Sequence, residues 1–207
     1  NIHNTSDIDL LNLKLSDNRL FDDMLHVVYC NNVRIDDVDL SNANADAIDV
    51  DISKNVRISR GTIENSGNDG IDLMTTNAII EDIRIAANGD KGISVGEASQ
   101  AQVRGARIED NVIGIEVKDG SVARTEYVLF AGNKTQLNAY QKNWRYGTGG
   151  TLEVRGSDFR GSSNVITAAE KSSIRIIDSS MIPPARPAKR VVFENVSANA
   201  PKRNARP

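Results

Sequence analysis

The sequence is poor in residue types that support several common kinds of site. Its 207 residues include one cysteine, Cys30, and two histidines, His3 and His26. A single cysteine excludes an internal disulfide and leaves the redox compartment open. Two histidines so far apart in sequence argue against a His-rich metal site and against a Ser-His-Asp triad.

Long apolar segments are also missing. No apolar run approaches the roughly 18 residues of a membrane-spanning helix, so we expect no membrane insertion. The chain is 39% hydrophobic and 26% charged, with a formal net charge of −3, which is ordinary for a soluble protein with one core. It starts at Asn1 without a signal-like segment, and we expect it to be part of a larger, multidomain protein.

Basic residues gather in the Pro-rich segment 183–207. Six basic side chains lie there against one acid, Glu194: Arg186, Lys189, Arg190, Lys202, Arg203 and Arg206. Such an end can bind an anionic partner or remain a solvated tail. Since nothing else in the chain points to nucleic acid, we expect no nucleic-acid partner.

One apolar pattern, h-x-h-x-x-h-x-h with h apolar or small, recurs along the whole chain. Its nine copies begin at Ile8, Val33, Val56, Ala78, Ala101, Ala123, Leu152, Ile174 and Val191. Successive copies start between 17 and 29 residues apart, most often 22 or 23. Each h-x-h unit has the period of a strand, and the two-residue gap predicts a bend between two short strands.

A further short strand is predicted after each of the second to seventh copies. In order, these strands contain Ile48/Val50, Ile71/Leu73, Ile93/Val95, Ile115/Val117, Leu137/Ala139 and Ile166/Ala168. Polar turns that carry asparagine precede these strands: Asn42 or Asn44, Asn65, Asn88, Asn111 and Asn133. Asparagine tolerates left-handed backbone and can hydrogen-bond a copy of itself one coil away. Three short strands per ~22 residues predict an all-β, right-handed parallel β-helix of about eight to nine rungs.

The turns Gly67–Asp72, Gly89–Gly96 and Ile113–Asp119 resemble those of bacterial right-handed parallel β-helix repeat proteins of the pectin-lyase-like superfamily. That superfamily includes pectate and alginate lyases, epimerases, polygalacturonases, phage tailspikes and adhesins. The resemblance implies a domain that binds or processes an anionic polysaccharide and lies outside the cell, at the cell surface or in the periplasm. The alternative is a non-catalytic scaffold of a cell-surface or phage protein, and whether the chain is an enzyme stays open.

Charged residues are expected to stack on one face after each turn. Asp49, Asp72, Ser94 and Glu116 take one outward position, Asp46, Asp69 and Lys91 a second, and Asp51 and Lys118 a third. Stacked carboxylates repel, and a hard cation, a nearby lysine or a raised pKa relieves the repulsion. By the resemblance, Asp46, Asp49 and Asp72 are candidate Ca²⁺ ligands, and Asp69, Asp72, Lys91 and Lys118 are candidate catalytic residues. The alternative is that turn geometry and solubility alone explain these residues.

An insertion at 140–150 lengthens one coil and carries three of the nine aromatic residues of the chain. Its candidate substrate-binding residues are Tyr140, Lys142, Trp144, Arg145 and Tyr146. Aromatic rings stack on sugars, and the basic side chains would meet uronate or sulfate groups. The alternative is that Trp144 packs over a coil as an apolar lid.

The repeats predict a β-helix over residues 1–182. Residues 1–30 are predicted to form an N-terminal cap or a truncated first rung. The segment 183–207 is predicted to be a separate Pro-rich, basic end with a last partial rung at 191–198, because prolines lack the N–H group that a continuing strand needs.

Overall fold

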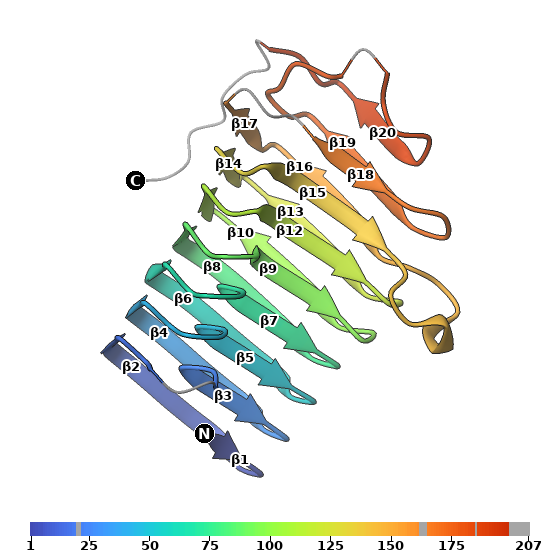
Figure 1. The fold of residues 1–207 in the computed structure, drawn as a ribbon. Helices are drawn as coiled ribbons and strands as arrows, with labels where there is room; N and C mark the ends of the chain where they lie inside the picture. Colours follow the sequence, from blue (N-terminus) through green and yellow to red (C-terminus); the bar gives the residue numbers. More distant parts are fainter. Residues whose placement is uncertain (20–21, 162–164, 185, 199–207) are drawn as a thin grey trace.

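The computed structural model describes residues 1–19, 22–161, 165–184 and 186–198. Its strands stack side by side into an elongated parallel solenoid (Figure 1). Sheet A contains β1 (Ile2–His3), β3 (Leu25–Val28), β5 (Ile48–Asp51), β7 (Ile71–Met74), β9 (Lys91–Gly96), β12 (Ile113–Lys118), β15 (Thr135–Tyr140) and β18 (Ile166–Ala168).

After each strand of sheet A, the chain continues into a strand of sheet B. Sheet B contains β2 (Ser6–Ser16), β4 (Asn31–Ser41), β6 (Lys54–Glu64), β8 (Asn77–Ala86), β10 (Gln100–Arg104), β11 (Arg107–Glu109), β13 (Val122–Glu126), β14 (Leu129–Ala131), β16 (Thr151–Arg155), β17 (Asp158–Arg160), β19 (Ser173–Ile177) and β20 (Val191–Glu194). A 3₁₀ helix, η1 (Trp144–Tyr146), lies between the two sheets in sequence. No helix in the described ranges is long and apolar enough to cross a membrane.

All nine copies of the apolar pattern lie in sheet B and pair in register. Val56, for example, pairs with Val33 on one side and with Ala78 on the other. The predicted fold, an all-β parallel β-helix, is confirmed. The solenoid makes about seven turns, slightly fewer than the eight to nine rungs expected. The last two copies lie in β19 and β20, and the described residues between these strands include no sheet A strand.

The predicted bend in the middle of each copy has one structural cause. The second residue of the two-residue gap has left-handed backbone in every copy, with φ between 48° and 60°. These residues are Asn12, Asp37, Arg60, Asp82, Gly105, Tyr127, Gly156, Asp178 and Asn195. A single left-handed residue changes the strand direction and shifts the side-chain alternation by one, so apolar residues face inward on both sides of the bend.

Asparagines form a buried ladder along the turn between the two sheets. Asn88 Nδ2 donates to Asn111 Oδ1 at 2.9 Å, and Asn111 Nδ2 donates to Asn133 Oδ1 at 3.0 Å, as predicted. The ladder does not extend to Asn65, because Asn65 itself takes the left-handed backbone and Ser66 occupies the buried position. The predicted ladder is therefore correct for three coils and wrong before them.

A second ladder, of hydroxyl groups, was not predicted. At the turn that follows sheet A, each hydroxyl accepts the backbone N–H of the preceding coil, through Ser53, Thr76, Ser99 and Ser121 in succession. These residues are buried, so the ladder satisfies backbone donors that the turn would otherwise leave unpaired. Together the two ladders hold the turns in register.

Strands near both ends of the described residues extend the stack. Residues 1–30 contribute β1, β2 and β3, and β20 pairs in parallel with β19. The predicted partial rung at 191–198 includes β20. Lys202, Arg203 and Arg206 of the basic end lie outside the described residues.

Candidate functional site

The outer face of sheet A presents three columns of side chains that run along the solenoid. The central column consists of residues that pair with one another from coil to coil, in the order His26, Asp49, Asp72, Ser94, Glu116, Asn138 and Thr167. Asp49 therefore lies directly opposite Asp72, as the repeat predicts. The column's carboxylates are Asp49 and Asp72 in neighbouring early coils and Glu116 two coils further on, beyond Ser94.

A first flanking column consists of aspartates that accept backbone N–H groups from the next coil. Asp23 Oδ1 accepts Asp46 N at 3.1 Å, and Asp46 Oδ1 accepts Asp69 N at 2.7 Å. Asp69 Oδ1 accepts Lys91 N at 2.9 Å, which ends the series. These carboxylates thus stabilise the turns by accepting their backbone N–H groups. Burial nevertheless raises the pKa of Asp69 to about 7, although the nearby Lys91 opposes the rise.

Lys91 is held between two carboxylates. Its Nζ lies 3.3 Å from Asp69 Oδ1 and also contacts Asp90. Burial by itself lowers the pKa of Lys91, but the contacts with Asp90 and Asp69 outweigh burial and raise it above the ordinary value. Lys91 therefore keeps its proton at neutral pH, which suits pairing with an anion better than abstraction of a proton.

Lys118 and Tyr140 meet around Glu116 in the later coils. Lys118 Nζ donates to Ser94 Oγ at 2.8 Å and lies 3.9 Å from Glu116 Oε1. Burial, followed by the charge of Glu116, raises the pKa of Tyr140 to about 12. Asn138 Nδ2 also donates to Glu116, at 2.9 Å. The structure thus brings the predicted Lys118 and Tyr140 together.

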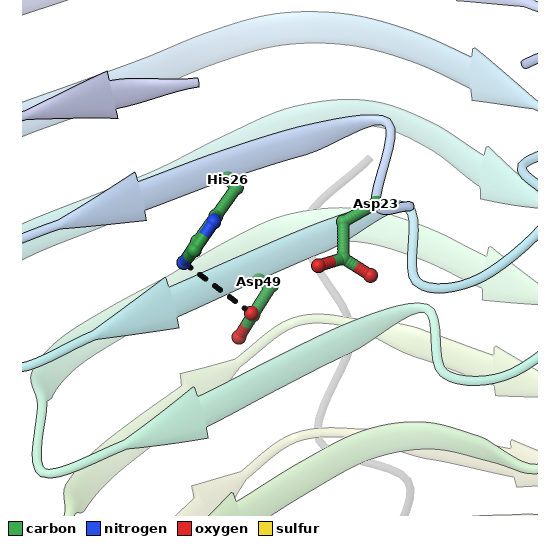
Figure 2. A group of neighbouring side chains, drawn as sticks. All are labelled: Asp23, His26 and Asp49. Carbon is green, nitrogen blue, oxygen red and sulfur yellow. Dashed lines mark ion pairs between the residues drawn. The ribbon is translucent and has the colours of Figure 1, made fainter. Parts of the chain in front are cut away.

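The first coils bring together a histidine and two aspartates, shown in Figure 2. One potential ligand atom from each of Asp23, His26 and Asp49 lies within 4.8 Å of the other two. His26 Nε2 is 3.5 Å from Asp49 Oδ2 and 3.2 Å from Asp51 Oδ2. Burial and the surrounding aspartates raise the pKa of Asp49 to about 8.

Of the predicted metal ligands, Asp49 alone belongs to this group. Asp46 Oδ1 is already bonded to Asp69 N and to Asn68 Nδ2, the latter at 2.7 Å. Asp23 and His26 were not among the metal ligands predicted from the sequence. Aligning Leu25 and Val27 with the later sheet A strands would have placed His26 in the central column.

The 140–150 loop projects beyond the neighbouring coils at the end of β15 (Figure 1). Asp119 Oδ1 accepts the backbone N–H groups of Lys142 and Asn143, both at 2.7 Å, and so anchors the loop. Trp144 is 80% exposed, so it does not pack over a coil as a lid. Lys142 and Arg145 are exposed beside it, whereas Tyr146 is half-buried.

The stacked parallel coils and the bent repeat define the class of protein as a parallel β-helix. The chain matches the family described as "Right handed beta helix region" over residues 1–159, and it belongs to that family. This agrees with the predicted right-handed parallel β-helix. Among curated proteins, no match was found.

Two solved structures share this architecture. An alginate lyase from Paenibacillus sp. str. FPU-7 superposes with a TM-score of 0.68 at 13% identity, covering 96% of this chain and 74% of the lyase. The enzymatically active domain of tailspike protein 2 from bacteriophage CBA120 gives a TM-score of 0.50 at 12% identity, covering 87% of this chain and 35% of that domain. At such identities the likeness concerns the fold.

Proposed function

We propose that this β-helix binds an anionic polysaccharide and that the 140–150 loop contacts the sugar. The observation that carries the proposal is Trp144, a large apolar side chain that is 80% exposed on an anchored loop. An exposed indole on a rigid support provides a flat apolar surface for a sugar ring and loses little entropy on binding.

The positive charge beside Trp144 supports an anionic polysaccharide as the ligand. Lys142 and Arg145 are exposed on the same loop and can donate to carboxylate or sulfate oxygens. Lys91 and Lys118, on the outer face of sheet A, are further candidates for pairing with a uronate carboxylate. The similarity in fold to an alginate lyase supports the same class of ligand.

Binding is tested through the indole itself, because Trp144 is the only tryptophan of the chain. Oligoalginate and oligogalacturonate should change its fluorescence on titration, and a neutral cello-oligosaccharide should do so less. Calorimetry should show that Trp144→Ala weakens binding at least about tenfold, or ~1.4 kcal/mol. Tyr29→Ala is the control, because it removes another aromatic ring that is 56% exposed, on the turn after β3. This substitution should leave the affinity unchanged.

Two results would overturn the proposal. One is an absence of binding to every anionic oligosaccharide, which would favour the alternative of a non-catalytic scaffold. The other is equal affinity of the Trp144→Ala and Tyr29→Ala proteins. Affinity that falls with added salt and with Arg145→Ala would support the anionic class.

Processing of the polysaccharide is a separate proposal that involves Asp69, Asp72, Lys91 and Lys118. Lyase action on alginate, pectate or glycosaminoglycans releases an unsaturated uronate that absorbs in the ultraviolet. Lys118→Ala should abolish the product if this face carries the reaction. No product from any of these polymers would leave a binding protein without lyase activity.

A further inference from the structure

The early coils of sheet A carry negative charge that basic side chains do not balance. Four carboxylates belong to this region: Asp23, Asp49, Asp51 and Asp72. Within the described residues, no lysine or arginine nitrogen lies within 4.0 Å of any of them, and only His26 makes such a contact. Asp69, which lies in the same coil as Asp72, by contrast has Lys91 at 3.3 Å.

Several of these carboxylate oxygens are buried without a hydrogen-bond donor. The side chain of Asp49 is only 10% exposed, and its Oδ1 has no partner. Oδ1 of Asp51 and Oδ1 of Asp72 are also buried and without a partner. An ionised carboxylate can only accept, so buried oxygens of this kind need a donor or a cation to compensate their lost hydration.

The geometry of the group suits a small ion. Figure 2 shows the ring of His26 and the carboxylates of Asp23 and Asp49 directed toward one another. His26 Nε2 and Asp49 Oδ2 are 3.5 Å apart. Two ligands bound at ~2.0–2.2 Å to one tetrahedral ion are separated by roughly 3.4 Å. These two atoms therefore already have the spacing of ligands that share an ion.

The donor types select the class of metal. Calcium and magnesium take oxygen ligands, whereas an imidazole nitrogen with carboxylates is typical of zinc, manganese, iron or cobalt. We propose that Asp23, His26 and Asp49 form a binding site for a divalent transition-metal ion, with Asp51 as a neighbouring carboxylate. Three protein ligands leave positions on the ion open to water or to an anionic ligand.

The Ca²⁺ site predicted from the sequence fits the structure less well. Its three residues would be Asp46, Asp49 and Asp72, but Asp46 Oδ1 already accepts two N–H donors. A site with His26 and Asp23 in place of Asp46 and Asp72 leaves both hydrogen bonds of Asp46 Oδ1 intact, and Asp23 Oδ1 accepts only one, from Asp46 N. The transition-metal site does not depend on polysaccharide binding, so either proposal can fail without the other.

Calorimetry on the full chain, first stripped with a chelator, tests the site with Zn²⁺, Mn²⁺ and Ca²⁺ separately. We expect one Zn²⁺ per chain, bound at least about tenfold more tightly than Ca²⁺, and weakening of at least about tenfold in His26→Ala and in Asp49→Asn. Co²⁺ should give a visible absorption band that is lost in His26→Ala. His3→Ala is the matched control, because it removes the only other histidine, which is exposed.

Folding of the variants is checked separately by circular dichroism. Asp49→Asn removes a buried charge and should fold, and Zn²⁺ should raise the melting temperature of the wild type but not of this variant. Ca²⁺ binding as tight as Zn²⁺ binding would overturn the proposal. So would Zn²⁺ affinity within twofold of wild type in both His26→Ala and Asp49→Asn.

Discussion

Removal of one amide from the asparagine ladder should destabilise the solenoid strongly. Asn111 is 1% exposed, and its Oδ1 accepts both the backbone N–H of Asn88, at 3.0 Å, and Asn88 Nδ2, at 2.9 Å. Asn111→Ala deprives both donors of their acceptor inside the core. Asn133 Oδ1 keeps one donor, because the backbone N–H of residue 111 also bonds to it.

Two buried donors without partners cost about 1–3 kcal/mol each, so we expect the free energy of unfolding to fall by about 2–6 kcal/mol. Urea denaturation followed by circular dichroism measures this loss. Asn77→Ala, which removes an exposed asparagine, should stay within about 0.5 kcal/mol of wild type. Faster hydrogen exchange at the Asn88 amide would locate the damage. A loss below ~1 kcal/mol in Asn111→Ala, with an unchanged urea dependence, would refute the reasoning.

Three further predictions concern the core and the buried acids. Phe130→Ala should cost about 3–5 kcal/mol, because the fully buried ring stacks on Phe159 with centroids 4.8 Å apart; a loss under ~1 kcal/mol in urea would contradict this. Contact with Arg60 holds the pKa of Asp36 well below its usual range, so its contribution to stability is present above about pH 4 and is lost as the pH falls. Asp36→Asn should therefore flatten the acid limb of a stability–pH curve, and an unchanged limb would argue against the pairing. Burial raises the pKa of Asp49 to about 8, so the metal-free protein should gain stability as the pH falls from about 8 toward 4. The Asp49→Asn protein should not show this gain. Identical stability–pH profiles of the two proteins in chelator would contradict the raised pKa.

The candidate site was predictable only in part. The repeat placed Asp49 opposite Asp72 and put Lys91 beyond Asp69, because residues one period apart must stack. It did not predict that the Asp69 carboxylate bonds to backbone, since turn conformation decides which atoms lie within reach. His26 was overlooked, because the turn before it does not follow the spacing of the later coils.

What the sequence by itself determined is the fold, since an apolar pattern repeated nine times allows one way of burying all its copies. The two-residue gap likewise determined the bend, which left-handed backbone supplies in every copy. The tertiary structure decided which polar groups are buried and with which partners. Asp49 is an outward residue by pattern, yet stacking neighbours exclude water from nine-tenths of its side chain. From the sequence alone, Trp144 could equally have packed over a coil as an apolar lid. In the structure, Asp119 accepts hydrogen bonds that anchor the 140–150 loop, and Trp144 lies in solvent.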